Sequence, residues 1–232
     1  MLRNADTATV HKLLELINKH WQDGYLPKHW KHSAVIPIPK PGKQPTQICN
    51  MRPVSLTPTI SKLMVKMVTT RFYRHLERCR YFHPFQTGFR PQLGTQDSLY
   101  LLHTTINRER KFCKGRPDTP VAVHLKKAFH TIGDPAIIKA VESTQAGTRL
   151  VNFVKAFLKD RTYQFLLSPG HLARHFTSSV GIPRGSVISP TLFNVVMAKI
   201  AWKLDQFKTF GLQCTLMMSP CGRPICSVHL NK

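Results

Sequence analysis

The spacing of hydrophobic residues constrains the fold of this chain most, because it changes repeatedly between the period of helices and that of strands. Near the amino terminus, apolar residues recur on one side of an amphipathic helix: Val10, Leu13, Leu14, Ile17 and Trp21. Helical spacing returns over 58–80, 95–110, 134–142, 148–159 and 188–205. Strand-like runs lie between these segments, at 33–38, 120–123, 162–167 and 173–180. This mixed order predicts an α+β domain.

The composition of the chain excludes a disordered polycation and points to polyanionic partners. Its 232 residues include 34 Lys or Arg and 11 Asp or Glu, which gives a net charge of +23. Hydrophobic residues make up 42% of the chain and charged ones 19%, close to the norm for globular proteins. No apolar run approaches the roughly 18 residues of a membrane span, and no secretory signal opens the chain. We therefore expect a cytoplasmic or nuclear protein that is neither secreted nor bound to a membrane.

The cysteines and the common catalytic motifs give no sign of a metal site or of another enzyme class. Six cysteines form no Cys-x-x-Cys pair, so free thiols are expected. Cys214, Cys221, Cys226 and His229 have six, four and two residues between them, which matches no common zinc module. No Gly-x-x-x-x-Gly-Lys-Ser/Thr loop, Gly-x-Ser-x-Gly elbow or His-Glu-x-x-His helix is present.

Four sequence segments resemble, in order and spacing, the reverse transcriptase of LINE-type non-LTR retrotransposons. They are WKHSAVIPIPKPGK at 30–43 with MRPVSLT at 51–57, FQTGFRPQLGTQDSL at 85–99, VAVHLKKAFHTI at 121–132, and GIPRGSVISPTLFNVVM at 181–197. The resemblance implies the fingers and palm of a right-hand polymerase, with fingers mostly in 1–115 and palm in 116–210. It also implies an RNA template, a DNA primer and deoxynucleotide triphosphates as partners, and Mg²⁺ as the family's cofactor.

The resemblance assigns nucleotide binding to residues in three of these segments. Lys40, Lys43 and Arg52 lie where the family's fingers loop approaches the phosphates, and Phe129 lies where a bulky ring crowds a ribose 2′-hydroxyl. Solvated loop cations and a buried aromatic ring are the structural alternatives. In the third segment the candidates are Arg184, Gly185 and Ser186.

The segment around Gly185 reads as a loop that enters a helix. Glycine lets the backbone approach a ligand closely, and Ser186 is expected to cap the helix. Arg184 stands where the family usually has Gln, and it adds a charge at that position. A purely structural turn and cap is the alternative.

The template strand is assigned to the second segment. The residues that match the family's template-binding element are Gln86, Gly88, Phe89 and Arg90. Phe89 is expected to contact the template or to anchor the core, and the two roles are compatible.

The catalytic carboxylates of the family are missing. Nucleotidyl transfer in this class uses three aspartates that hold two Mg²⁺ ions. The first should stand at position 124, in the pattern Asp-Leu-Lys-Lys-Ala-Phe-Asp, but both aspartates of that pattern are replaced, by His124 and His130. Imidazole is a poor ligand for Mg²⁺, which prefers oxygen donors. The sequence therefore predicts no intact catalytic residue and little or no polymerase activity.

The other two aspartates belong to a Tyr-Ala-Asp-Asp hairpin after the last long helix, and no such string occurs. Back-translation from Met217 and Met218 shows that a shifted reading frame permits Tyr-Ala-Asp-Asp-Val-Thr-Leu-Trp over 214–222. We therefore expect 211–232 to be an off-frame, unstructured tail, with an incomplete palm and no thumb.

Two alternatives to an inactive polymerase domain remain open. The chain could be a non-enzymatic, basic nucleic-acid-binding fragment, for which the charge of +23 is the support in the sequence. It could also be a genomic relic whose product never folds stably.

Overall fold

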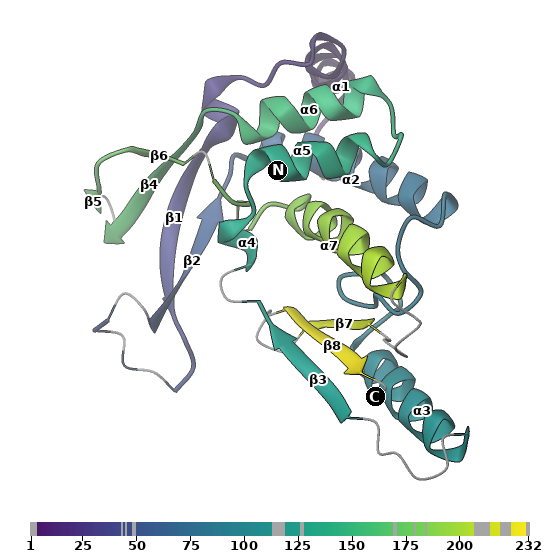
Figure 1. Cartoon of the computed structure of the whole chain (residues 1–232). Helices are drawn as coiled ribbons and strands as arrows, with labels where there is room; N and C mark the ends of the chain where they lie inside the picture. The colour runs from purple at the N-terminus through teal and green to yellow at the C-terminus, as the bar shows by residue number, and fades with distance from the viewer. Residues whose placement is uncertain are drawn as a thin grey trace.

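The computed structural model describes residues 4–42, 44, 46–47, 50–112, 119–125, 128–168, 171–178, 180–183, 185–206, 214–218 and 224–230. Two β-sheets lie on different sides of a group of packed helices (Figure 1). No helix in these ranges is both long and apolar enough to cross a membrane.

The larger sheet has five strands and is called the five-stranded sheet. Its members are β1 (His32–Pro39), β2 (Met51–Leu56), β4 (Arg161–Ser168), β5 (His171–Leu172) and β6 (Phe176–Ser178). β1 lies between β2 and β4, and both β5 and β6 pair with β4. The β1–β2 pair is antiparallel, with Ile36 opposite Val54, whereas β1 and β4 run parallel, with His32 opposite Thr162.

The smaller, three-stranded sheet has the order β3-β8-β7 and is antiparallel throughout. Its strands are β3 (Thr119–His124), β7 (Cys214–Met218) and β8 (Pro224–Leu230). The sequence predicts no regular structure beyond Gly211, so this hairpin is a difference from the prediction. Its strands carry β-prone residues such as Thr215 and Val228.

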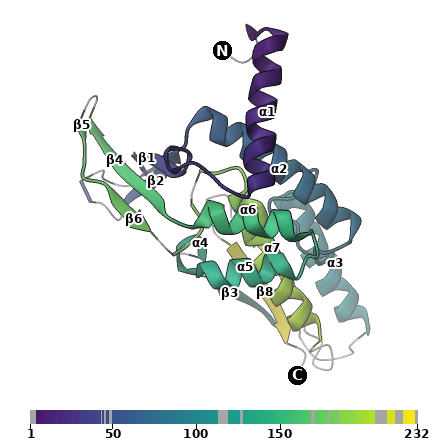
Figure 2. The ribbon, with the colours of Figure 1, turned by 90° about the horizontal axis from the view of Figure 1, so that it is seen from above.

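The helices form the body of the molecule. They are α1 (Thr7–Asp23), the 3₁₀-helix η2 (Lys28–Lys31), α2 (Thr59–Arg78), α3 (Thr95–Phe112), α4 (Ala128–Thr131), α5 (Asp134–Glu142), α6 (Thr148–Leu158) and α7 (Ser189–Asp205). Figure 2 shows that α1 crosses this body at its carboxyl end and projects away from it at its amino end. Accordingly Ile17 is buried, whereas Val10 is 47% exposed.

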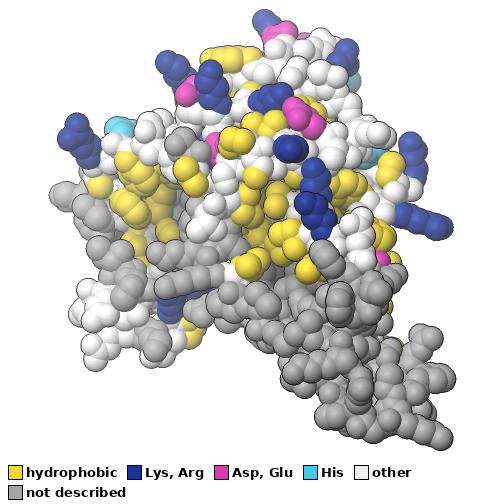
Figure 3. Space-filling model, viewed as in Figure 1, with side chains coloured by type: hydrophobic (Ala, Val, Ile, Leu, Met, Phe, Trp, Pro, Cys, Tyr) yellow, Lys and Arg dark blue, Asp and Glu magenta, His cyan; other side chains and the backbone are white. Residues whose placement is uncertain are grey.

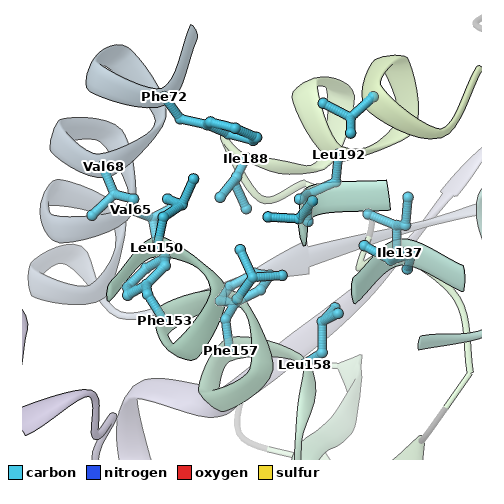
Figure 4. Close-up of a cluster of buried hydrophobic side chains, with 14 of the residues drawn as sticks. Val65, Val68, Phe72, Ile137, Leu150, Phe153, Phe157, Leu158, Ile188 and Leu192 are labelled. Atoms are coloured by element: carbon cyan, nitrogen blue, oxygen red, sulfur yellow. The ribbon is translucent and has the colours of Figure 1, made fainter. Parts of the chain in front are cut away.

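A continuous hydrophobic core fills the space between the helices. Side chains from α2, α5, α6 and α7 meet there, including Phe72, Ile137, Phe153 and Leu192 (Figure 4). Each of these four is at most 5% exposed. Full burial of one such side chain contributes about 1.5–3 kcal/mol, so this core accounts for the helical part of the fold.

The six predicted helices are confirmed to within a few residues. The predicted strands at 33–38, 120–123 and 162–167 are confirmed as β1, β3 and β4, the one predicted at 173–180 is observed only over Phe176–Ser178 (β6), and β2 and β5 were not predicted. Pro53 lies in the middle of β2. Proline cannot donate to a strand ladder, but it is tolerated at a sheet edge, and β2 is an edge strand.

Candidate functional site

The β1–β2 hairpin brings two predicted nucleotide-binding cations to the same end of the five-stranded sheet. Lys40 directly follows β1, and its backbone N–H donates to the carbonyl of Asn50 at 2.9 Å. Arg52 lies two residues further along, opposite Ile38. Both side chains are partly exposed. Lys43 lies outside the described residues.

The loop before α7 lies directly against β2. Gly185 has a φ of +93°, and a Cβ built on it would lie 2.6 Å from the carbonyl oxygen of Ser55. Only glycine fits this backbone and this distance. From the sequence, the backbone at Gly185 is expected to approach a ligand closely. In the structure it approaches β2 of the same chain. Arg184, its neighbour, lies outside the described residues.

The entry into α7 differs from the predicted cap. The helix begins at Ser189, with Ile188 at the N-cap position, so Ser186 does not cap it. Pro190 fixes the start of the helix, since proline suits the first helical turn. The hydroxyl of Ser189 instead donates to the carbonyl of Pro183 at 2.5 Å, which closes the loop back on itself. Ser186 is 8% exposed and lies below the surface of this loop.

Three phenylalanines join the predicted nucleotide and template segments. Phe129 stacks on Phe193 of α7 with ring centroids 4.5 Å apart. The ring of Phe89 contacts Phe129 edge-on, with 6.1 Å between their centroids. The backbone carbonyl of Phe129 also accepts from the N–H of Ile182 at 2.7 Å. Phe129 therefore packs against the core, as its structural alternative expects, and still borders the loop before α7.

Phe89 is the exposed member of this aromatic group. Its ring is 44% exposed and its backbone has a φ of +55°, which is rare for a bulky residue. Strained conformations of this kind concentrate at ligand sites, because the surrounding structure must hold them in place. Phe89 is thus the predicted template residue that the structure leaves most accessible.

The neighbours of Phe89 are held inside the protein. Gln86 is 2% exposed, and its Nε2 donates to the carbonyl of Asn194 on α7 at 2.9 Å. The Nδ2 of Asn194 in turn donates to the carbonyl of Gly88 at 2.7 Å. This exchange fixes the 86–90 segment on α7, so Gln86 supports the segment from beneath and does not face solvent.

Arg90 is engaged by an acid on α2. Its guanidinium donates to both carboxylate oxygens of Glu77, with N–O distances of 2.9 and 2.7 Å, and Tyr73 donates to the same carboxylate. Burial opposes ionisation of Glu77, but these hydrogen bonds outweigh it and lower the pKa of Glu77 below its ordinary value. Burial and the bond to Glu77 raise the pKa of Tyr73 to about 12. Arg90 is therefore committed to an internal ion pair.

Arg161, at the start of β4, is a structural centre that the sequence did not reveal. Its side chain is 4% exposed and donates to three partners: the carbonyl of Leu158 at 2.8 Å, the carbonyl of Gly181 at 2.7 Å and the carboxylate of Asp134 at 3.1 Å. Burial raises the pKa of Asp134, although the charge of Arg161 acts against that rise. Arg161 thereby ties α5, α6 and the loop before α7 to the five-stranded sheet.

A cavity of about 180 Å³ lies beside Arg161, between the five-stranded sheet and the loop before α7. Aromatic and apolar side chains line most of it, with Tyr163 and Phe176 stacked 5.4 Å apart. Ser55 contributes to its wall and also contacts Gly185. The cavity therefore adjoins the predicted nucleotide-binding loop.

The three-stranded sheet aligns position 124 with the β7–β8 hairpin. His124 pairs with Ile225 of β8, and Ile225 pairs with Met217 of β7. Positions 124, 225 and 217 thus form one row across the three strands, close to where β7 ends and β8 begins. The hairpin follows α7, where the family's aspartate hairpin is expected, and this row carries no carboxylate. A histidine, an isoleucine and a methionine do not fit Mg²⁺, which prefers oxygen ligands.

The structure thus brings together Phe89, Phe129 and the 181–186 loop, and places Lys40 and Arg52 on the adjoining hairpin. Sequence reasoning missed three residues that hold them: Ser55, Arg161 and Asn194. Asn194 had a usable signal, since it is a polar residue in the middle of a predicted apolar helix. Within the described side chains no group of three or more potential metal ligands occurs.

Comparison with known proteins agrees with this arrangement. The chain is 32% identical over 174 residues to the RNA-directed DNA polymerase from the mobile element jockey of Drosophila melanogaster, covering 74% of this chain and 18% of that protein. It is 26% identical over 197 residues to the Pol polyprotein from the type-1 retrotransposable element R2 of Popillia japonica, covering 84% and 26%. The chain therefore spans about a fifth to a quarter of the length of these relatives.

Among solved structures, apo telomerase from Candida tropicalis, truncated from its C-terminal domain, has the same fold with a TM-score of 0.61. That likeness covers 96% of this chain and 49% of the telomerase chain at 10% identity. The sequence profile of the family described as "Reverse transcriptase (RNA-dependent DNA polymerase)" matches residues 38–218, which include the four motif segments almost entirely. The α+β fold with polymerase fingers and palm is thereby confirmed, and the chain belongs to the reverse transcriptase family, with non-LTR retrotransposon polymerases among its relatives.

Proposed function

We propose that this domain keeps the nucleic-acid-binding site of a reverse transcriptase and has lost its chemistry. The row of His124, Ile225 and Met217 carries this proposal, because the register aligns the family's catalytic position with the hairpin and leaves both without an aspartate. Two-metal catalysis needs carboxylates that hold both ions, and none of these residue types replaces them. Mg²⁺, the cofactor of the family, is therefore not expected to bind productively.

Binding of template and primer is the part of the function that the geometry supports. Phe89 is exposed and contacts Phe129, which in turn borders the loop before α7. Aromatic rings stack with bases regardless of sequence, and cations such as Arg52 bind phosphate. We assign the template to the segment of Gly88 and Phe89. An incoming nucleotide is assigned to Lys40, Arg52, Phe129, Gly185 and Ser186, with Lys43 and Arg184 as sequence-based candidates.

Primer extension on an RNA template with Mg²⁺ tests the loss of chemistry. The protein should incorporate no deoxynucleotide above background, and His124→Asp alone should restore nothing, because the hairpin aspartates are still missing. Measurable incorporation by the unmodified chain would overturn the proposal. A matched sample of an active reverse transcriptase on the same template shows that the assay detects synthesis.

Salt dependence tests the binding. The charge of +23 favours a second candidate function, that of a non-enzymatic nucleic-acid binder, which would act through the same surfaces. In either case the affinity for an RNA–DNA template–primer should fall log-linearly with salt, since counterions are released from the phosphates. Affinity that is independent of salt would exclude both.

The variant Phe89→Ala separates the two candidate functions. It should weaken template–primer binding about tenfold if bases stack on this ring, and leave that binding unchanged if the binding is purely electrostatic.

A further inference from the structure

The outer face of α2 carries a row of cations that the proposed site does not use. We define the α2 basic face as Lys62, Lys66, Arg71, Arg74 and Arg78; Lys62 is partly exposed and the other four are exposed. The opposite side of the helix is buried against the core through Met64, Val68, Phe72 and Leu76. The cations therefore point away from the core along almost the whole helix.

No acid balances this face. Glu77, the one acid of α2, is held by Arg90 and Tyr73. None of the five cations forms an ion pair with an acid that the structure describes. Other long helices mix the two signs, as α1 does with Glu15 and Lys19. Like charges on a single face repel one another, and a bound polyanion removes that repulsion.

Most of the α2 basic face lies away from the candidate site, and its carboxyl end approaches the template segment where Glu77 binds Arg90. α2 starts just after β2 and runs behind α1 to the far side of the helical body, away from the five-stranded sheet (Figures 1 and 2). Lys and Arg side chains are also scattered over the face of the molecule shown in Figure 3, where some acids lie among them. The α2 basic face differs in that its five cations outnumber the one acid of the helix, Glu77, which Arg90 engages.

The length of the row matches one nucleic-acid strand. From Lys66 to Arg78 the helix rises by about 18 Å, at 1.5 Å per residue. Phosphates follow one another at about 3.4 Å along a stacked strand, so the row spans about five of them. At about 100° per residue, Arg74 and Arg78 lie about 80° and 120° around the helix from Lys66, so the cations cover the outer side of α2 broadly.

An apolar cavity adjoins the row and favours a strand with unpaired bases. The cavity holds about 140 Å³ between α1, α2 and α6, and Arg71 and His75 contribute to its lining. Trp21 and Phe72 supply aromatic surface inside it. A base that leaves the stack of a single strand can enter such a space, whereas the paired bases of a duplex cannot.

From these observations we propose that the α2 basic face is a second nucleic-acid site, which binds the sugar-phosphate backbone of a single strand outside the template–primer site. RNA and DNA share the phosphate chemistry that this face recognises. The site is additional to the proposed function, and it does not depend on whether the polymerase site is active or occupied.

The test uses the full chain and a fluorescent 20-nucleotide single strand, with oligo(U) and oligo(dT) as separate arms. Unlabelled template–primer duplex is present at saturation to occupy the first site. The variant Lys66→Gln/Arg74→Gln/Arg78→Gln removes three charges from the α2 basic face. The control variant Lys12→Gln/Lys19→Gln/Lys28→Gln removes three exposed charges from α1 and the segment after it.

The α2 variant should bind the single strand at least about tenfold more weakly near 0.1 M salt. Its salt slope should be smaller by about 2, because each lost phosphate contact removes about 0.7. The control variant should keep both values. Equal losses in the two variants would overturn the proposal, and so would an α2 variant that binds like the unmodified chain. Comparing the oligo(U) and oligo(dT) arms identifies which of the two strands the face prefers.

The outcome is independent of the template–primer site. Direct titration with labelled duplex should give the same affinity for the α2 variant and the control variant. If the unmodified chain binds no duplex but the α2 variant still loses single-strand binding, the proposed function fails and this inference stands. Unchanged thermal melts show that both variants are folded, as expected for substitutions at exposed positions.

Discussion

At the residue scale, this chain uses its few acids as internal partners of cations. Three of its 11 acids form ion pairs with Arg or Lys in the described part of the chain: Glu77 with Arg90, Asp134 with Arg161 and Glu142 with Lys155; a fourth, Asp205, lies 3.7 Å from the ring of His83. These pairs differ widely in burial. The Arg161 side chain is 4% exposed, whereas Lys155 and Glu142 are each 48% exposed. Burial therefore decides which pair matters for stability.

Arg161→Met should destabilise the protein by about 3–5 kcal/mol, because it leaves Asp134 without its partner and the carbonyls of Leu158 and Gly181 without their donor. Lys155→Met is the matched control and should cost at most about 1 kcal/mol, since its pair is exposed to water. Urea unfolding of both variants measures the difference. Equal losses would mean that Arg161 does not tie the helices to the sheet.

Glu77 should give the protein an acid-sensitive contribution to its stability. Because the pKa of Glu77 is lowered in the folded state, its ionised form stabilises the fold above about pH 4.5, and this contribution is lost as the pH falls through the lower, folded value. Asp134 acts in the opposite direction: its pKa is raised from 3.8, so its contribution falls as the pH rises through that higher value.

Glu77→Gln is therefore expected to flatten the loss of stability below about pH 4.5. The free energy of unfolding, measured between pH 6 and pH 3.5, should decline less in the variant than in the unmodified protein. Asp97→Asn is the control, because Asp97 is exposed and forms no ion pair with a described cation. Parallel pH profiles for Glu77→Gln and the unmodified chain would contradict the expected role of Glu77.

At the element scale, the sequence predicted what local periodicity determines and missed what depends on pairing. The six longer helices follow from apolar spacing and were predicted, whereas the short helices η2 and α4 were not. β2 was missed because its pairing with β1 is a tertiary property: Pro53 lies opposite Pro37 of β1, and a strand was predicted for β1 despite that proline. The β7–β8 hairpin was missed because Leu216, Met217 and Met218 do not alternate between apolar and polar residues.

The contact between β2 and the loop before α7 is the element-scale feature with the sharpest test. Gly185→Ala and Gly147→Ala place alanine at almost the same φ, +93° and +92°, but only Gly185 would press a Cβ against a neighbour, the carbonyl of Ser55. Both variants should lose about 1–2 kcal/mol to backbone strain. Gly185→Ala should lose about 1–3 kcal/mol more from the clash. Chemical denaturation of the pair measures this excess, and equal losses would show that the loop can move off β2.

At the scale of the whole molecule, the site depends on contacts between residues that are distant in sequence. The motifs predicted that Phe89, Phe129 and the 181–186 loop belong to one site, and the fold places Phe129 next to both of the others. They could not show that Gln86 and Arg90 face inward, because Asn194 and Glu77 lie on other helices that only the fold brings near them. The partners of a polar side chain are a tertiary property, and one sequence without its fold does not give them.

The distribution of buried residues also predicts how the molecule responds to loss of its carboxyl end. Most side chains of the described core come from the helices, and the others come from loops that precede Gln206, such as those of Leu26, Phe82 and Ile182. A chain ending at Gln206 should therefore still unfold cooperatively, with a melting temperature lower by a few degrees, equivalent to about 1–2 kcal/mol. Cooperative unfolding of the shortened chain is expected if 211–232 is an off-frame tail. Such a tail pairs with β3, but the rest of the fold does not require it. Circular dichroism melts of the full and shortened chains decide it: a broad, non-cooperative transition in the shortened chain would make the β7–β8 hairpin an integral part of the fold and argue against an off-frame origin.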